Sequence, residues 1–292
     1  MKRIGVRKAC PAGRGAMTLA AAAILAAPGT AQGQGGEGME VKSRKDIPYL
    51  ETAADSVRQV LDVFAPEGVE GAPVMVFVHG GAFHMSDKAD GRYYPETGER
   101  LARAGFVAVL PNYRLTPETY YPGHAEDVAG AVAWTFRHIA GYGGDPSKVF
   151  LSGHSAGGLL AAAVALDRDL LADHGTEADA LRGVIPICGQ FQIIGPGRQG
   201  TFGEDSSAWS RFSPLSLIRP DAPPFLVLEA SGDDWWAPGQ AEVFADALEI
   251  ARVPFMFREL EHDHYSIITG LGTEGDPTLG LIRDFTERML RP

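Results

Sequence analysis

The chain has 292 residues, of which 45% are hydrophobic and 22% are charged, and its formal net charge at pH 7 is −11. This composition is typical of a globular protein with a buried core, and the length favours one large α/β domain over two small ones. A strongly acidic surface repels nucleic acids and anionic membranes, so we expect neither as a partner.

The first residues have the order of a secretory signal peptide. Residues 1–14 are basic with no acidic side chain, and a short alanine-rich apolar run over 17–27 is followed by small residues. The run is too short to span a bilayer, which makes a retained anchor the lesser alternative. We therefore expect a signal peptide over 1–31, a flexible leader over 32–56 and a single domain over 57–292. Translation starting at Met17 stays open, and the mature protein is predicted to be periplasmic or secreted, without membrane attachment.

The rest of the chain alternates short apolar runs with amphipathic segments. Strands are predicted over residues 59–64, 74–79, 107–111, 149–152, 183–187, 225–230 and 254–260, and helices over residues 92–104, 125–139, 156–166, 240–251 and 279–290. Strands of this length separated by helices predict an α/β fold with a mostly parallel central sheet and helices on both faces. The irregular stretch 189–224 is long for a connection, and we interpret it as a partial lid.

The most informative motif is GHSAGG over residues 153–158, which places Ser155 in the pattern G-x-S-x-G. A predicted strand precedes the motif and a predicted helix follows it. A strand that turns sharply into a helix holds a serine at the apex of a strained turn, and the glycines keep that turn free of clashes. Ser155 is therefore predicted to be a nucleophile.

Acidic and basic candidates follow two later strands. Asp233 and Asp234 come after the strand over 225–230, and His262 and His264 come after the strand over 254–260. The order serine, aspartate, histidine is that of α/β-hydrolases, whereas trypsin and subtilisin present these groups in other orders. Either aspartate is a candidate acid, and His264 is the preferred base because a helix-like apolar segment follows it.

These residue types fit acyl transfer. A serine hydroxyl is a weak nucleophile, so a neutral imidazole must take its proton, and a carboxylate must orient that imidazole. The substrate carbonyl becomes an oxyanion, which needs preorganised N–H donors. The predicted donors are the backbone N–H groups of Ala156 and of the HGGAF loop over 79–83.

Four further residues are predicted to contact substrate: Phe83, His154, Trp235 and Trp236. Core packing is the alternative for the paired tryptophans. A metal site on His262 and His264 would need further ligands at recognisable spacing, and the sequence offers none, so we expect no metal and no other cofactor. Only Cys188 would remain after removal of the signal peptide, which excludes an intramolecular disulfide in the mature chain.

The HGGAF loop, residues 112–118, Asp127, GHSAGG and the late aspartate and histidine resemble α/β-hydrolase carboxylesterases of the hormone-sensitive-lipase-like group. The likeness is closer to the branch of BD-FAE-type feruloyl/acetyl esterases and kynurenine formamidase, and it covers about residues 60–290. It implies an α/β-hydrolase fold with a minimal lid, Ser155 as nucleophile and His264 as base. By the same resemblance, Gly81, Ala82 and Ala156 would shape the oxyanion hole. It also implies Asp234 as acid, because Pro238 follows four residues later. Ala82 departs from the third glycine of lipase-like loops, but it keeps its backbone N–H.

We therefore predict a serine carboxylesterase that hydrolyses short acyl or aryl esters of small molecules through an acyl-enzyme. A formamidase of the kynurenine type is the first alternative, although the predicted signal peptide argues against an intracellular substrate. A non-catalytic binding protein on a hydrolase scaffold is the second, and the presence of serine, aspartate and histidine candidates argues against it.

Overall fold

The computed structural model describes residues 39–51, 57–195, 197–235 and 239–291. These residues belong to the same compact unit, which extends over residues 35–292. The predicted signal peptide and the first part of the predicted leader lie outside the described residues. Within the described ranges, no helix combines the length and the apolar character that a membrane span requires.

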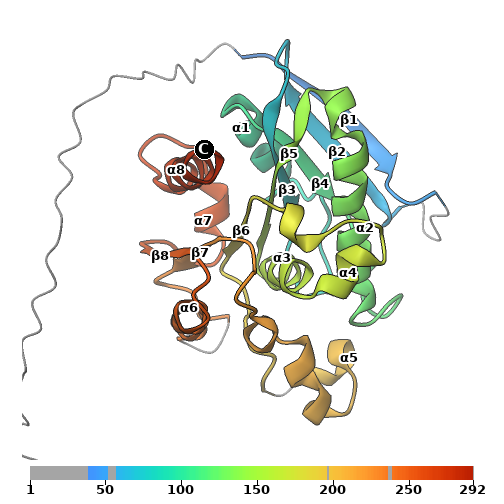
Figure 1. Cartoon of the computed structure of the whole chain (residues 1–292), viewed down its shortest axis with the longest axis vertical. Coiled ribbons are helices and arrows are strands. Elements are labelled where there is room, and N and C mark those ends of the chain that lie inside the picture. The colour runs from blue at the N-terminus through green and yellow to red at the C-terminus, as the bar shows by residue number, and fades with distance from the viewer. Residues whose placement is uncertain (1–38, 52–56, 196, 236–238, 292) are drawn as a thin grey trace, which may run out of the picture. The chain divides into compact units, whose positions relative to one another are not determined.

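The described strands form one eight-stranded sheet in the order β1-β2-β4-β3-β5-β6-β7-β8 (Figure 1). The strands are β1 (Val41–Pro48), β2 (Val60–Pro66), β3 (Ala72–Val78), β4 (Val107–Pro111), β5 (Gly144–His154), β6 (Gly183–Ile187), β7 (Phe225–Ala230) and β8 (Phe255–Leu260). The pairs β1–β2 and β2–β4 are antiparallel, and all the other neighbours are parallel. The loops after β3, β5, β7 and β8 therefore leave the same edge of the sheet.

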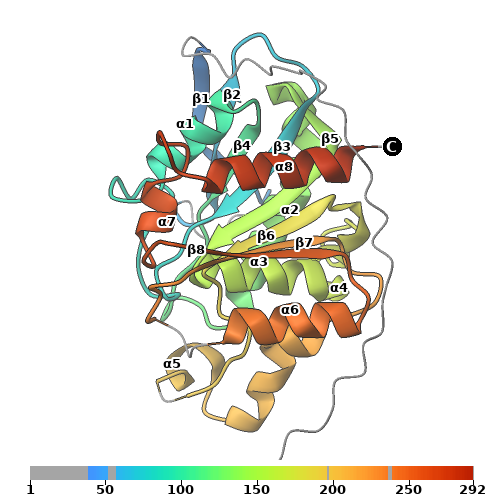
Figure 2. The ribbon, with the colours of Figure 1, turned by 90° about the vertical axis from the view of Figure 1, so that its left-hand side faces the viewer.

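Helices cover both faces of the sheet (Figures 1 and 2). The α-helices are α1 (Pro95–Arg103), α2 (Gly123–His138), α3 (Ala156–Leu166), α4 (Arg168–Ala172), α5 (Gln199–Phe202), α6 (Gln240–Ile250), α7 (Ser266–Thr269) and α8 (Thr278–Leu290). Residues of α2, α3 and α6 belong to one buried apolar cluster, and residues of α1, α7 and α8 belong to a second. The two clusters are the layers on either side of the sheet. Every residue of α3 is buried, which holds the start of this helix firmly in place.

Each strand and helix predicted from the sequence is present, with boundaries that differ by a few residues in most cases. The expected flexible leader is wrong for residues 41–48, because they form β1 and pair along β2. β1 is an edge strand whose side chains are mostly exposed, so it lacks the apolar alternation by which a strand is recognised in sequence. β5 also begins earlier than expected, in a polar segment.

The stretch interpreted as a lid contains α5 and two short 3₁₀ helices, Ser206–Phe212 and Pro214–Leu217. Phe202 is buried against Phe83, with ring centroids 5.4 Å apart. The Thr201 hydroxyl lies 3.1 Å from Nε2 of His84. This stretch therefore packs on the outer side of the loop that follows β3.

Candidate active site

Ser155 lies between β5 and α3 in a strained backbone conformation, with φ 57° and ψ −120°. Such a conformation costs on the order of 1–3 kcal/mol and persists only where its surroundings enforce it. Here Ser155 N–H donates to the carbonyl of Ile187 over 2.9 Å. A Cβ atom on Gly157 would lie 2.2 Å from the Val78 carbonyl oxygen, so the motif requires glycine at that position. The turn thereby presents the Ser155 hydroxyl at the carboxyl edge of the sheet.

His264 connects this hydroxyl to a carboxylate. Its Nε2 lies 2.9 Å from Ser155 Oγ, and its Nδ1 lies 2.6 Å from Oδ2 of Asp233. A carboxylate only accepts hydrogen bonds, so in the neutral ring Nδ1 carries the proton and Nε2 is left to accept from the serine. The side chains of His264 and Asp233 are only 4% and 3% exposed, which shields this chain of hydrogen bonds from water.

The prediction of Asp234 as the acid is wrong, because Asp233 occupies the position behind His264. Asp234 is exposed. Burial opposes ionisation of Asp233, but hydrogen bonds from the His264 ring and from Trp235 N–H hold the pKa of its carboxyl below the ordinary value. Adjacent side chains in the tight turn after β7 point in different directions, and the turn aims the first of the pair inward. Pro238, on which the choice of Asp234 rested, lies outside the described residues.

The loop after β3 exposes backbone N–H groups beside the serine. Gly81 has φ +108°, and a Cβ atom there would lie 1.9 Å from the Met85 carbonyl oxygen. The Gly81 carbonyl accepts two hydrogen bonds, from the N–H groups of His84 and Met85. Among the described residues, the N–H groups of Gly81, Ala82 and Ala156 donate to no acceptor. These groups are available to a bound ligand.

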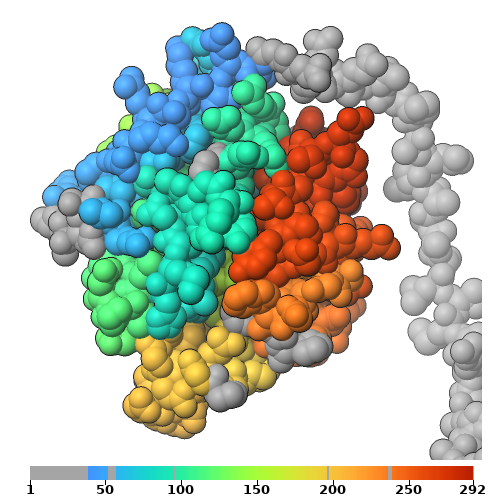
Figure 3. Space-filling view, turned by 180° about the vertical axis from the view of Figure 1, so that it is seen from behind, coloured from blue at the N-terminus to red at the C-terminus, as the bar shows by residue number. Residues whose placement is uncertain are grey.

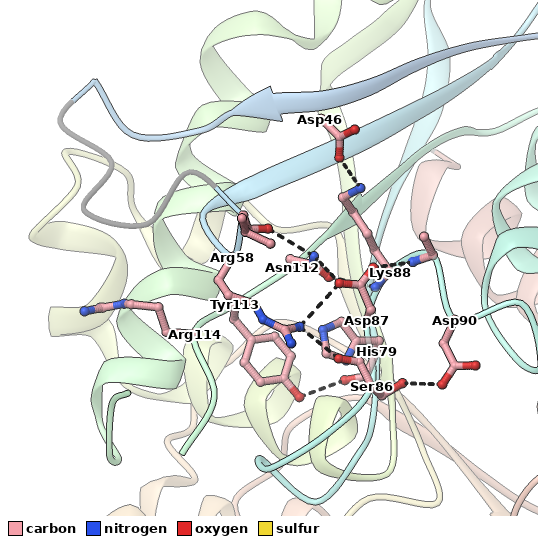
Figure 4. A network of polar contacts seen from close by, with 12 residues as sticks. Asp46, Arg58, His79, Ser86, Asp87, Lys88, Asp90, Asn112, Tyr113 and Arg114 are labelled. Atoms are coloured by element: carbon pink, nitrogen blue, oxygen red, sulfur yellow. Dashed lines mark hydrogen bonds and ion pairs between the residues drawn. The ribbon is translucent and has the colours of Figure 1, made fainter. Parts of the chain in front are cut away.

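Aromatic side chains fix the beginning of this loop by stacking and hydrogen bonding. His79 donates from Nδ1 to the Gly80 carbonyl over 2.7 Å, and its ring stacks on Tyr113 with centroids 4.4 Å apart. The Tyr113 hydroxyl donates to the His79 carbonyl over 3.1 Å (Figure 4). Burial lowers the pKa of His79 to about 4, so its ring stays neutral at pH 7. His79 therefore supports the loop and does not act as an acid.

The far end of the loop is anchored by Lys88, which is 5% exposed. Its ammonium group lies 2.7 Å from Oδ1 of Asp62 on β2 and 2.7 Å from Oδ1 of Asp46 on β1. Burial opposes its charge, but these two hydrogen bonds raise the pKa of Lys88 above the ordinary value. Figure 4 shows Lys88 reaching up to the edge strand. The edge strand β1 is thus connected to the loop that lines the site.

Asn112 joins the same network at the end of β4. Its side-chain oxygen accepts from Lys88 N–H over 2.7 Å, and its amide nitrogen donates to Asp87 over 2.7 Å. Arg58 donates to the Ser86 carbonyl over 2.9 Å (Figure 4). Three separate segments of the chain therefore fix residues 86–88.

A cavity of about 100 Å³ opens onto Ser155. Its lining consists of Gly81, Ala82, Met85, Ser86, Asp90, Arg92, Tyr93, Tyr94, His154, Ser155, Trp235, His264 and Tyr265. The Trp235 ring stacks on His264 at 5.3 Å, and Tyr93 stacks on Tyr265 at 4.8 Å. Figure 3 shows the blue-green segment after β3 lying against the orange-red C-terminal part of the chain, where this lining comes together.

Known proteins resemble this chain in sequence. Residues 61–181 match the BD-FAE family. Esterase LipQ of Mycobacterium tuberculosis is 29% identical over 242 residues, which cover 76% of this chain and 56% of LipQ. The probable carboxylic ester hydrolase LipM of the same organism is 32% identical over 212 residues, which cover 65% of this chain and 48% of LipM. The chain thus spans about half the length of these curated relatives.

Solved structures agree in fold. Esterase B from Lactobacillus Rhamnosis superposes with a TM-score of 0.72 at 20% identity, over 85% of this chain and 86% of that protein. The propionate-bound esterase Est2 of Thermogutta terrifontis gives a TM-score of 0.69 at 23% identity, over 87% and 95%. This chain has the α/β-hydrolase fold. Its relatives confirm the predicted resemblance to carboxylesterases of the hormone-sensitive-lipase-like and BD-FAE type.

The α/β-hydrolase fold brings together most of the predicted site residues. Ser155, His264, Gly81, Ala82, His154 and Trp235 line the cavity. Phe83 was predicted to contact substrate, but it is 2% exposed and packs in the core against Phe202 and His124. Trp236 lies outside the described residues.

Sequence reasoning missed the walls of the cavity. Tyr93 and Tyr94 directly precede α1, and Tyr265 follows His264. An aromatic pair before a helix is an ordinary packing signal, and only the meeting of distant loops turns these residues toward Ser155. No local pattern in the sequence reveals such a meeting.

His262 makes contacts separate from those of His264. Its Nε2 lies 2.9 Å from Asp276, and its Nδ1 lies 3.2 Å from the Ser266 hydroxyl. Within the described residues, the one cluster with possible metal-ligand atoms is Cys188, Asp233 and His264, within 4.8 Å of one another. His264 and Asp233 already use the relevant atoms in their mutual hydrogen bond, so we assign this cluster to the hydrogen-bonded chain that ends at Ser155.

Proposed function

We propose that this α/β-hydrolase is a serine carboxylesterase in which Ser155, His264 and Asp233 form the catalytic triad. The observation that carries the proposal is the buried chain of hydrogen bonds from Asp233 through His264 to a strained Ser155, which opens into a small cavity. A binding protein has no need for a serine paired in this way. The names of LipQ and LipM, an esterase and a probable carboxylic ester hydrolase, support the same reaction class.

The proposed reaction has two steps. His264 Nε2 takes the proton of Ser155 as Oγ attacks the ester carbonyl, and Asp233 stabilises the imidazolium that forms. The oxyanion accepts hydrogen bonds from among the N–H groups of Gly81, Ala82 and Ala156. The imidazolium then protonates the departing alcohol. Departure of the alcohol leaves the acyl group bonded to Ser155 Oγ. In the second step, His264 takes a proton from water as the water oxygen attacks the acyl carbon, and it returns that proton to Oγ as the acyl–Oγ bond breaks and the acid leaves.

The dimensions of the cavity favour small ester substrates. A volume of about 100 Å³ accommodates a short acyl group. The aromatic walls formed by Tyr93, Trp235 and Tyr265 offer flat apolar surfaces to an aryl group. Asp90 and Arg92 are paired at 2.8 Å, so the polar part of the lining offers no net charge to the ligand. We therefore propose neutral short-chain acyl or aryl esters as substrates.

The export of the protein is a separate proposal that rests on residues 1–31. Their basic, apolar and small-residue order supports a cleaved signal peptide and a periplasmic or secreted enzyme. Cell fractionation of the expressed full chain, with mass spectrometry of the mature N-terminus, tests it. Recovery of the uncleaved chain in the cytoplasm would contradict it.

Parallel assays on p-nitrophenyl acetate, p-nitrophenyl butyrate and N-formylkynurenine test the proposed reaction. We expect the highest kcat/KM on one of the two esters, because esters need less protonation of the leaving group than amides. A higher kcat/KM on N-formylkynurenine would favour the formamidase alternative. No turnover of any of the three, together with no labelling by a fluorophosphonate, would favour the binding protein.

A further inference from the structure

A second chain of buried hydrogen bonds crosses the site beside the triad. It runs from Gly80 through Tyr94 and His154 to the main chain of His264. We propose that Tyr94 and His154 are positioning residues of the reaction, which together form a strut that holds the oxyanion loop and the base at a fixed separation across Ser155. The proposal rests on the esterase function, because its effect is on the rate of that reaction.

The strut joins elements that are far apart in the sequence. Gly80 follows β3, Tyr94 directly precedes α1, His154 ends β5 and His264 follows β8. Gly80 N–H lies 2.9 Å from the Tyr94 hydroxyl, which lies 3.0 Å from His154 Nδ1. His154 Nε2 lies 2.7 Å from the His264 carbonyl oxygen. Tyr94 and His154 are 2% and 1% exposed, so water does not compete for these bonds.

The protons of the strut have only one consistent arrangement. A carbonyl oxygen only accepts, so His154 donates from Nε2 to His264. In a neutral imidazole Nδ1 is then an acceptor, and the Tyr94 hydroxyl must donate to it. The same hydroxyl oxygen accepts from Gly80 N–H. Each donor therefore has one acceptor, and the chain of bonds runs in one direction from the loop to the base.

His154 stays neutral, which this arrangement requires. Burial, with repulsion from His264, lowers the pKa of His154 to about 3. Burial raises the pKa of Tyr94 above its ordinary value. The groups that face His154 are the Tyr94 hydroxyl, the rings of His264 and Tyr265, and the more distant charge of Asp233. His154 is therefore no proton carrier at neutral pH, and its role is to hold other groups in place.

The position of the strut explains why it should affect the rate. A Cβ atom on Gly80 would lie 2.9 Å from the Tyr94 hydroxyl and 3.0 Å from Ser155 Cβ. The strut and the nucleophile therefore both lie directly against Gly80. The next residues, Gly81 and Ala82, carry the proposed oxyanion donors. At the other end, the strut holds the main chain of His264, whose ring accepts the serine proton. A loss of the strut would shift donors and base relative to the nucleophile.

Substitutions at both positions test the proposal. Tyr94→Phe and His154→Leu each break the strut, whereas His154→Gln keeps one donor and one acceptor. We expect kcat on p-nitrophenyl acetate to fall by about 10- to 100-fold in the first two variants, with a much smaller change in KM. His154→Gln should recover part of that loss. Titration of active sites with a phosphonate counts the competent molecules, so incomplete folding does not imitate a lower kcat.

The double variant separates positioning from simple packing. If Tyr94 and His154 act through one strut, Tyr94→Phe combined with His154→Leu should lose no more than the larger single loss. Losses that multiply would contradict the strut, as would a Tyr94→Phe variant with kcat within about twofold of the wild type. Tyr142→Phe and His138→Gln, which lie away from the cavity, serve as matched controls with unchanged kcat.

Histidine ¹⁵N NMR gives a readout that does not depend on activity. We expect His154 to show a single Nε2–H tautomer that does not titrate between pH 5 and 8. Titration in this range, or a proton on Nδ1, would contradict the strut even in an active esterase. An inactive protein with the expected NMR signals would instead contradict the esterase function and leave the geometry of the strut standing.

Discussion

His264 Nδ1 lies 2.6 Å from Oδ2 of Asp233, although Asp234 stands next to it in the chain and is exposed. The second carboxylate oxygen, Oδ1 of Asp233, accepts from Trp235 N–H over 2.9 Å. Both oxygens are therefore held, and the imidazole has one preferred tautomer and orientation. The backbone of the turn after β7 directs Asp233 toward His264 and leaves Asp234 exposed. A pair of matched variants tests this difference between the two aspartates.

Asp233→Asn should lower kcat by about 10⁴-fold, because an amide cannot hold His264 in the tautomer that accepts the serine proton. Asp234→Asn is the matched control and should leave kcat nearly unchanged. Steady-state kinetics on p-nitrophenyl acetate measures both. A large loss in the Asp234 variant alone would reverse the assignment of the acid.

Gly81→Ala should lower kcat on the order of 10²- to 10³-fold, the usual effect of losing an oxyanion donor. The new Cβ atom would lie 1.9 Å from the Met85 carbonyl oxygen, at a residue with φ +108°, so the loop must move. Gly91→Ala in the same region serves as the control, because a Cβ atom there meets nothing within 4 Å. Equal kcat values for the two variants would show that the loop is not part of the catalytic machinery.

Lys88→Met should reduce the free energy of unfolding by about 1.5–3 kcal/mol, because the buried Asp62 loses one charge-assisted hydrogen bond and keeps only those from the Lys45 ammonium group and the Asp46 N–H. The side chain of Asp62 is only 2% exposed. Asp46, whose side chain is 72% exposed, provides the contrast, and Asp46→Asn should cost about 1 kcal/mol or less. Urea unfolding followed by circular dichroism measures both values. A Lys88 variant as stable as the Asp46 variant would contradict the anchoring role.

Glu229 predicts a dependence of stability on pH. Burial, with repulsion from Asp233 and Glu242, raises the pKa of its carboxyl from 4.5 to about 8. Between these values the unfolded chain has released the proton while the folded protein keeps it, so this group makes stability fall as pH rises from about 4.5 to 8.

Glu229→Gln removes this effect. The variant should gain stability relative to the wild type as pH increases over that window, by at most about 1.4 kcal/mol per pH unit. Unfolding free energies at pH 5, 6, 7 and 8 measure the difference, with Glu249→Gln, an exposed position on α6, as control. If the difference in unfolding free energy between the Glu229 variant and the wild type stayed constant or shrank as pH rises, Glu229 would be ionised in the folded protein.

The fold and the nucleophile could be predicted from the sequence because their signals are local. The apolar runs of the inner strands are buried on both faces, and Ser155 is marked by glycines that only a tight turn requires. β1 escaped prediction because an exposed edge strand needs no apolar pattern. The choice between Asp233 and Asp234 and the burial of Phe83 depend on how side chains leave a turn, which residue types do not reveal.

The strut formed by Tyr94 and His154 could not be predicted from the sequence, for a different reason. Tyr94 and His154 are separated by 60 residues, and each has an ordinary neighbourhood in the sequence. Their hydrogen bond exists only because β3, β5 and β8 end at the same edge of the sheet. Positioning residues of this kind become apparent only when the loops are assembled.

The proposed reaction depends most on Ser155 as the nucleophile. Incubation of the wild-type protein and of Ser155→Ala with a fluorophosphonate, followed by peptide mass spectrometry and an ester assay, tests this directly. We predict one covalent adduct on Ser155 in the wild type, no adduct in the variant, and loss of ester hydrolysis with an unchanged unfolding transition. Substantial ester hydrolysis by correctly folded Ser155→Ala would contradict the account.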